Sequence, residues 1–262
     1  MTAPAEYQRH SLIAHWTRRI SEGAHVGWQQ LPRGAFARWL LIIAIGAALS
    51  FGLTAALTLG ARDYIPRSGL DDWDRQIILA ARDEWPIGFT DAIIFESPGN
   101  ILILLPLTLL AAGMCLSYGR LLWAMSLLVC YGLARLLIWT GWALWERARP
   151  DLIADGAAAL SAHSFPSGHI LLVFTTYGLL AWFWIRSTLS WIDRVIAIVL
   201  LLAVAAVVTA GRLRLGAHWP TDMIAGAVIG LFWLAWNVLA IEWAARAPAA
   251  APTSAAGASA TT

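Results

Sequence analysis

Residues 195–233 read VIAIVLLLAVAAVVTAGRLRLGAHWPTDMIAGAVIGLFW, and this stretch decides the fold. Two apolar runs flank a short segment that contains Arg212, Arg214, His218 and Asp222. Both runs continue beyond the quoted stretch, and the resulting spans, Ile192–Ala210 and Asp222–Ile241, are long enough to cross the ~30 Å hydrocarbon layer of a bilayer as helices. Polar groups at that depth are costly, so the segment between the two runs indicates a functional site at the end of two membrane spans.

The composition of the whole chain is typical of a polytopic membrane protein. Of 262 residues, 59% are hydrophobic and only 13% are charged, against about 25% charged residues in soluble domains. The net charge of +2 is small, which argues against a nucleic-acid partner. Cys115 and Cys130 both fall inside apolar runs. We interpret them as small core residues rather than as a disulfide or metal ligands.

We predict an all-α membrane bundle with six transmembrane spans. The expected spans are Phe36–Gly60, Asn100–Ser117, Leu121–Trp145, Gly168–Ile185, Ile192–Ala210 and Asp222–Ile241. They form one membrane domain over residues 36–242, which follows a polar N-terminal segment, residues 1–35, without a signal-peptide pattern. The tail, residues 243–262, is rich in Ala, Pro, Ser and Thr, and we expect it to be disordered.

Arginines predict the orientation of the bundle, and all 18 basic residues are arginines. They cluster before the first span and in the connections after the second and fourth spans: Arg9, Arg18, Arg19, Arg33, Arg38, Arg120, Arg186 and Arg194. By the positive-inside rule, these ends are expected to be cytoplasmic. The segments 61–99, 146–167 and 211–221 then lie together on the opposite side, and we place that side in the periplasm of a bacterial inner membrane.

Two surface helices are expected outside the spans. The first is Asp71–Trp85, in a net acidic segment, with Trp73, Ile77, Ile78 and Ala81 at helical spacing. Asp71 or Asp72 is expected to cap its N-terminus. The second lies on the cytoplasmic side around His10–Ile20, where the sequence has some amphipathic character.

The polar segment between the last two spans suits chemistry at phosphorus. His218 and Asp222 are four residues apart, which places them on one helix face. A carboxylate bonded to one imidazole nitrogen fixes the tautomer and raises the basicity of the other nitrogen. That second nitrogen can then attack phosphorus and form a covalent intermediate. Arg212 can bind a phosphate oxygen through its planar guanidinium.

Two further segments on the same side complete a candidate phosphate site. Pro166-Ser167-Gly168-His169 begins the fourth span, where free N–H groups and the helix dipole favour anions. His169 can give a proton to the leaving group, and Arg149, which precedes Pro150, offers a second guanidinium. Each segment alone could be a helix boundary, a cap or an interfacial pair. Their occurrence together on one side predicts a functional site.

These segments resemble the signature of the type 2 phosphatidic acid phosphatase superfamily of integral-membrane lipid phosphatases. That signature has a lysine seven residues before an Arg-Pro pair, then Pro-Ser-Gly-His, then a Ser-Arg pair followed by His and Asp at the spacing found here. The resemblance covers about Asp71 to Ile241. It implies a metal-independent and cofactor-free phosphohydrolase with His218 as nucleophile, Asp222 orienting it and His169 as general acid. It further implies a phosphate held by Arg149, Ser167, Gly168 and Arg212.

The chain departs from this signature at two positions. Trp142 stands at the lysine position and Gly211 at the serine position. Loss of a charge-assisted contact costs about 1.5–3 kcal/mol, so we expect a substitute cation, with Arg147 and Arg135 as the main candidates and Arg214 as another. Trp142 itself is either an interfacial anchor or part of a changed substrate pocket.

The sequence therefore predicts a lipid phosphatase that acts on a phosphomonoester or pyrophosphate, with undecaprenyl pyrophosphate and phosphatidyl phosphates as candidate substrates. Two alternatives stay open: a lipid phosphotransferase, and a non-catalytic membrane protein that binds lipid phosphate, which Trp142 favours. The oligomeric state is left open. A soluble haloperoxidase with a similar phosphate site is disfavoured by the six apolar spans.

Overall fold

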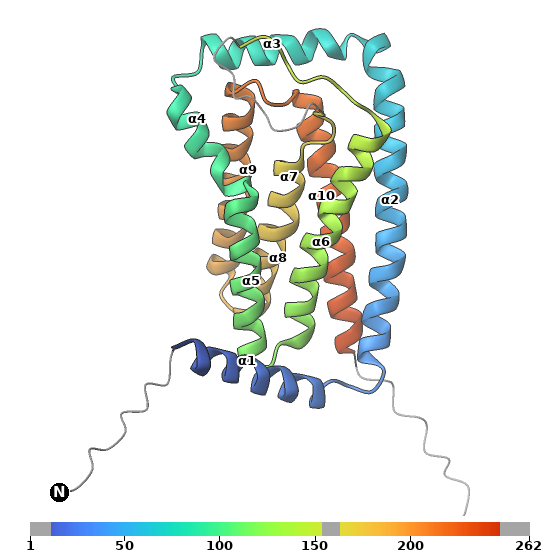
Figure 1. Ribbon diagram of the computed structural model, residues 1–262, viewed down its shortest axis with the longest axis vertical. Helices are drawn as coiled ribbons and strands as arrows, with labels where there is room; N and C mark the ends of the chain where they lie inside the picture. The colour runs from blue at the N-terminus through green and yellow to red at the C-terminus, as the bar shows by residue number, and fades with distance from the viewer. Residues whose placement is uncertain (1–11, 154–162, 247–262) are drawn as a thin grey trace, which may run out of the picture.

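The computed structural model describes residues 12–153 and 163–246. Over these residues it confirms the predicted all-α bundle, with six stretches long and apolar enough to cross a membrane. Four of these spans are single helices: α2 (Ala35–Ser68), α6 (Leu121–Leu144), α9 (Trp191–Arg214) and α10 (Pro220–Ala245). The second span consists of α4 (Phe89–Glu96), the 3-10 turn η1 (Ser97–Gly99) and α5 (Ile101–Ser117). The fourth span consists of α7 (Gly168–Leu172), the π-helical turn η2 (Val173–Tyr177) and α8 (Gly178–Ser187). Two more helices, α1 (Leu12–Gln29) and α3 (Leu70–Asp83), lie across opposite ends of the bundle (Figure 1).

The spanning helices extend beyond the predicted spans. α2 runs to Ser68 instead of Gly60, and α9 continues through Gly211 to Arg214, so that most of the motif before His218 is helical. α10 begins at Pro220, a residue suited to the first helical position because it lacks an N–H. It ends at Ala245, three residues past the predicted domain boundary at residue 242. The rest of the predicted tail, residues 247–262, lies outside the described residues.

Both expected surface helices are present, with different ends. α3 matches the predicted helix closely, and α1 extends the amphipathic N-terminal segment to Gln29. The predicted cap of α3 was wrong. Gly69 occupies the N-cap position with φ 76°, a left-handed conformation that glycine adopts at little cost. Asp71 and Asp72 lie in the first turn, where the helix dipole favours carboxylates.

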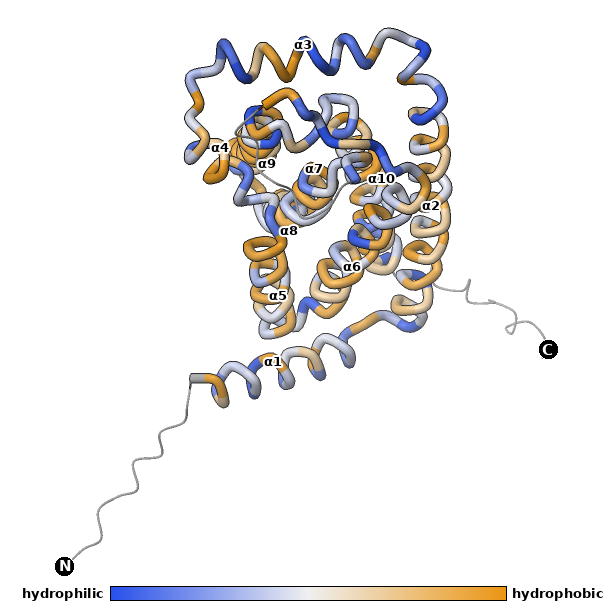
Figure 2. The backbone as a smooth tube through the Cα atoms, turned by 45° about the horizontal axis from the view of Figure 1, so that its top comes forward, coloured by the Kyte–Doolittle hydropathy of each residue, from blue (hydrophilic) through white to orange (hydrophobic). Residues whose placement is uncertain are grey.

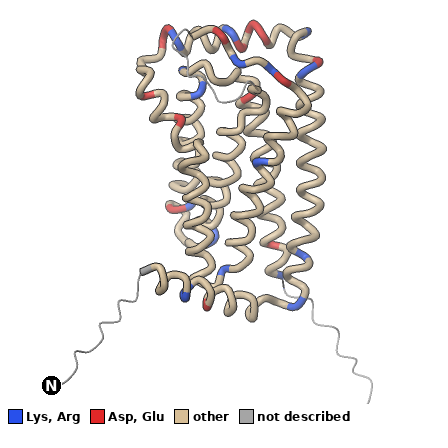
Figure 3. The backbone as a smooth tube through the Cα atoms, viewed as in Figure 1, with Lys and Arg blue, Asp and Glu red and all other residues tan. Residues whose placement is uncertain are grey.

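Polar and apolar residues separate along the bundle axis. The spanning helices are mostly hydrophobic, whereas α3 and the connections beneath it are hydrophilic (Figure 2). Charged residues lie mostly toward the two ends of the bundle, with few between them (Figure 3). This distribution is what a bilayer around the middle of the bundle requires.

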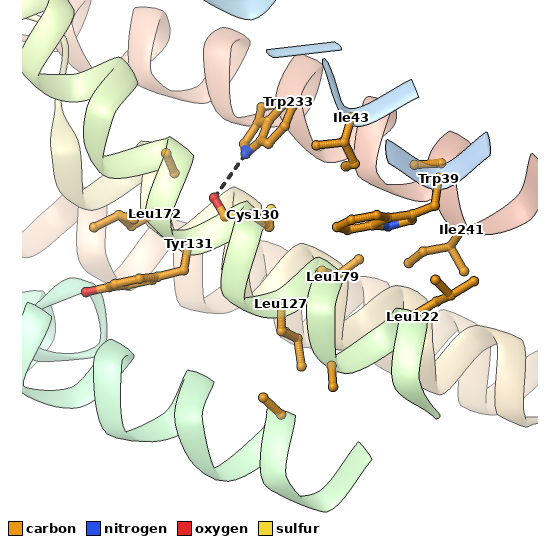
Figure 4. Packing of buried hydrophobic residues seen from close by; sticks show 14 of the residues in the cluster. Trp39, Ile43, Leu122, Leu127, Cys130, Tyr131, Leu172, Leu179, Trp233 and Ile241 are labelled. Atoms are coloured by element: carbon orange, nitrogen blue, oxygen red, sulfur yellow. Dashed lines mark hydrogen bonds between the residues drawn. The ribbon is translucent and has the colours of Figure 1, made fainter. Parts of the chain in front are cut away.

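Aromatic and small residues hold the middle of the bundle together (Figure 4). The Trp233 indole is fully buried and donates to the Cys130 carbonyl at 3.0 Å, while Trp39 donates to the Ser126 hydroxyl at 2.8 Å. α10 packs along α2, and a Cβ at Gly46 would lie 2.5 Å from the Trp236 Cβ. Such close approach through small residues is typical of helix packing in membranes.

The connections place the three motifs at one end of the bundle. The segment after α6, the start of α7, the end of α9 and the start of α10 all lie at the end that α3 covers (Figure 1). Part of the first of these segments, residues 154–162, is outside the described residues. Cys130 is buried in the core, as expected, whereas Cys115 is only partly buried and packs against the core from outside.

Candidate active site

His218 lies at the centre of the site and is 1% exposed. Its Nδ1 is 2.8 Å from the Ser164 carbonyl oxygen and 3.5 Å from Asp222 Oδ2. Because a carbonyl oxygen can only accept, Nδ1 carries the proton and Nε2 keeps its lone pair. Nε2 is 3.4 Å from Arg149 Nη1. The free lone pair of the imidazole therefore points toward a cation, where an anionic substrate would bind.

Ser164 is the residue that the sequence did not indicate. The expected orienting group was Asp222, but the Ser164 carbonyl is the nearer acceptor of the Nδ1 proton. Asp222 is fully buried, and its Oδ2 accepts from the Trp219 backbone N–H at 2.8 Å, which caps α10. It remains close enough to stabilise positive charge on the His218 ring.

Arg147 joins three segments through buried carboxylates. Its guanidinium donates to Asp222 Oδ1 at 2.6 Å, to Asp74 Oδ2 at 2.8 Å and to the Thr221 hydroxyl at 2.6 Å. Asp74, fully buried on α3, also accepts from the Thr221 backbone N–H at 2.9 Å. This predicted substitute cation thus holds α3 against the start of α10, and two buried carboxylates already balance its charge.

Arg149 lies beside His218, the predicted nucleophile. It donates to the Ala217 carbonyl and lies next to His218. Burial, followed by the charge of Arg212, lowers the pKa of Arg149 to about 10, so it remains protonated at neutral pH. Burial is also the main cause that lowers the pKa of His218 well below its usual value, with Arg212 and Arg149 adding to it. The site therefore keeps the imidazole neutral and able to attack.

Arg212 is buried, and one of its nitrogens, Nη1, pairs with the carboxylate of Glu96. Its Nε is buried without a hydrogen-bond partner among the described residues. Glu96 ends α4, and its side chain is 14% exposed. The sequence analysis missed Glu96 as a site residue. The signal that could have found it is an acidic residue next to an apolar span, where such residues are rare and usually functional.

The Pro-Ser-Gly-His segment lies beside these groups. The Ser167 backbone N–H donates to the Asp222 carbonyl at 3.0 Å, which joins the start of α7 to that of α10. Ser167 Oγ and His169 Nε2 are buried and have no hydrogen-bond partner within the described ranges. A Cβ at Gly168 would contact Ile138 at 3.3 Å, which shows how closely α7 approaches α6. Together with Arg212 Nε, these unsatisfied groups are suited to bind an oxyanion.

The remaining candidates, Arg135, Arg214 and Trp142, contact residues other than His218, Arg149 and Arg212. The Arg135 guanidinium lies 5.9 Å from the centroid of the Trp139 ring and has no hydrogen bond or ion pair with the described part of the chain. Arg214 donates from Nε to the Ile87 carbonyl at 2.8 Å. The Trp142 ring lies 6.1 Å from the His163 ring, and its indole nitrogen is buried without a partner among residues 12–153 and 163–246.

An apolar hollow lies beside Thr221. It has a volume of about 430 Å³, within the range of small-molecule sites. α2, α10 and the start of α3 line it, together with Phe165. Phe165 directly follows Ser164, so this hollow borders the segment whose carbonyl contacts His218.

The fold and the site together define an integral membrane protein with a buried histidine–arginine centre at one end of six spanning helices. The family model described as PAP2 superfamily matches residues 123–246 of the chain. The match includes all three sequence motifs.

Two further comparisons, both with Bacillus subtilis proteins, agree with this match. Over 132 residues the chain is 30% identical to phosphatidylglycerophosphatase B of strain 168, covering 49% of this chain and 63% of that protein, so the match spans less than two thirds of the relative. The second comparison is with the solved structure of a transmembrane PAP2 type phosphatidylglycerolphosphate phosphatase from Bacillus subtilis, which superposes on this chain with a TM-score of 0.61 and 25% sequence identity. The superposition covers 75% of this chain and 96% of the solved chain.

Proposed function

We propose that this protein is a lipid phosphatase that hydrolyses a phosphomonoester or pyrophosphate through a phosphohistidine intermediate, without a metal or other cofactor. The observation that carries the proposal is the state of His218: its Nδ1 proton is held by the Ser164 carbonyl, and its Nε2 lone pair lies beside Arg149. A protein that only binds phosphate has no need of a buried neutral imidazole with a free lone pair.

In the first step, His218 Nε2 attacks phosphorus, and the bond from phosphorus to the leaving oxygen breaks. A proton on His169 Nε2 passes to that oxygen. Arg149, Arg212 and Ser167 stabilise the phosphoryl oxygens, where charge develops. Attack makes the His218 ring cationic, and the Asp222 carboxylate at 3.5 Å stabilises this charge. Water then attacks the phosphohistidine, gives a proton back to His169, and releases phosphate.

The substrate class follows from the surroundings of the site. The site lies at one end of a membrane bundle, and the apolar hollow beside Thr221 has room for part of a hydrocarbon chain. The name of the Bacillus subtilis relative favours phosphatidylglycerol phosphate, beside the undecaprenyl pyrophosphate and phosphatidic acid expected from the sequence. The arginine distribution supports a site that faces the periplasm from a bacterial inner membrane.

One observation favours a second candidate function. Trp142, in place of the signature lysine, supports a non-catalytic protein that binds lipid phosphate. The unpaired His169 Nε2 favours the enzyme, because a general acid has no role in simple binding.

The test is phosphate release by purified protein in detergent from phosphatidylglycerol phosphate, phosphatidic acid and undecaprenyl pyrophosphate, with a chelator present. We expect turnover that survives chelation, an acid-labile phosphoenzyme after rapid quenching, and loss of both in His218→Ala. Equal turnover by His218→Ala would exclude His218 as the nucleophile. Lipid-phosphate binding without turnover in the wild type would support the non-catalytic alternative.

A further inference from the structure

Gly211 lets α4 lie directly against α9. A Cβ at this position would be 2.6 Å from the Ala92 carbonyl oxygen and 2.7 Å from the Glu96 backbone nitrogen. Both distances are well below contact, and both atoms belong to backbone that cannot rotate away. Any side chain at residue 211, including the serine of the family signature, would therefore push α4 outward. The glycine does more than remove a hydroxyl, because it sets the distance between these two helices.

This close approach brings the Glu96 carboxylate to Arg212, the residue after Gly211. The two side chains form an ion pair in which Arg212 is 7% and Glu96 14% exposed. The turn that follows Glu96 is fixed as well, because the Tyr177 hydroxyl donates to the Pro98 carbonyl at 3.0 Å. The carboxylate is therefore held next to a guanidinium that the phosphoryl group is expected to use.

The charges of the site are then balanced. Three arginines and three carboxylates lie within it, all buried except Arg149 and Glu96, which are partly exposed: Arg147, Arg149, Arg212, Asp74, Asp222 and Glu96. The more exposed Asp71 lies at the rim, 3.5 Å from Arg147, and one further cation, Arg135, acts on His169 through its charge. Trp142 adds no charge where the signature has a lysine. A doubly charged phosphoryl group would therefore enter a site without excess positive charge, and it would meet the Glu96 carboxylate beside Arg212, one of the groups expected to bind it.

We propose that Glu96, admitted by Gly211, selects the charge of the phosphoryl group, so that the site accepts the singly charged form in preference to the doubly charged form. Glu96 acts through Arg212 and by direct repulsion, and it is a specificity-determining residue rather than a catalytic one. This inference rests on the proposed function, because it concerns the same phosphate site. A phosphomonoester loses its second proton near pH ~6, so the two forms interchange in an accessible range.

Other charged and titratable groups of the site lie on the elements around Glu96. Arg212 faces it from α9, Arg149 and His218 belong to the connecting segments, and His169 belongs to α7. All four are unchanged in a Glu96 variant. The ratio of variant to wild-type KM at each pH therefore isolates the contribution of Glu96.

The test compares the wild type with Glu96→Gln and Gly211→Ser, as full-length protein in detergent, using a short-chain phosphatidic acid from pH ~5.5 to ~7.5, a window around the phosphate pKa. In the wild type, KM should rise with pH. In Glu96→Gln, KM at the upper pH should be about tenfold lower, equivalent to ~1.4 kcal/mol, and the rise should be nearly absent. Gly211→Ser should change KM in the same direction, and the double variant should add nothing further.

Asp91→Asn is the matched control, because Asp91 is an exposed carboxylate on the same helix whose Oδ2 accepts from the Gly88 backbone N–H at 3.3 Å. It should keep the wild-type dependence of KM on pH. Identical profiles for wild type and Glu96→Gln would overturn the inference. If the wild type shows no turnover, the proposed function fails, and the inference is tested by calorimetric binding of glycerol phosphate over the same pH range. Equal pH dependence of that binding in wild type and Glu96→Gln would then overturn it.

Discussion

Arg147 offers the sharpest test of how the site is built. Arg147→Met removes the cation that Asp74 and Asp222 share, and both carboxylates are fully buried. Removing one partner of a buried ion pair costs about 3–5 kcal/mol, because the other charge remains without compensation. For a chain of this size, that cost corresponds to a fall in melting temperature of about 10 °C. We also expect a loss of activity of at least about tenfold, because Asp222 loses its position.

The assay is thermal unfolding of the purified protein in detergent, read by tryptophan fluorescence, together with phosphate release. Arg82→Met is the control, because Arg82 pairs with Asp83 on the exposed surface of α3. Adding Asp74→Asn to Arg147→Met should recover part of the lost stability by removing one uncompensated carboxylate. Loss of activity at an unchanged melting temperature would refute this reasoning and assign Arg147 to the phosphate instead.

Three further predictions concern the chemistry and the lipid. Because burial lowers the pKa of His218, the ring stays neutral, and phosphoenzyme formation should persist as pH falls through the usual histidine value of about 6.5; a loss of formation centred at or above that value would contradict the neutral site. Arg135→Ala should weaken activity at least about tenfold if its guanidinium replaces the missing lysine, and unchanged kcat and KM would remove it from the site. Gly60 lines the apolar hollow, and a Cβ there would have no neighbour within 4 Å, so Gly60→Trp should raise KM for long-chain but not short-chain lipid phosphates. Gly52→Trp, at an exposed position of the same helix outside the hollow, should not, and equal effects of the two would show that the hollow holds no lipid chain.

The spans could be predicted because their signal is local. A run of about 20 apolar residues determines a membrane helix without reference to its neighbours. The helix ends were less predictable. α2 continues from Gly60 to Ser68 through charged residues, because helical backbone remains favourable beyond the hydrocarbon layer. The cap of α3 was misassigned because a left-handed glycine leaves no side-chain signal.

The site could be predicted only where a motif carries it. Arg149, His169, Arg212 and His218 occur in recognisable segments, and the structure brings their surroundings together. Asp74, Glu96 and Ser164 do not, because their roles depend on contacts between distant segments. The Ser164 contribution is a backbone carbonyl, which any residue could supply, so no residue type could have marked it. The importance of Gly211 is likewise visible only once α4 lies against α9.

The two unpaired thiols make this chain convenient for labelling. Cys130 is 1% exposed and packed in the bundle, so a membrane-impermeant maleimide has no access to it in the folded protein. Replacing Cys115 with serine would give a nearly silent background. A single cysteine introduced at an exposed position of α3 would then report, in intact cells, which side of the bilayer carries the end of the bundle with the active site.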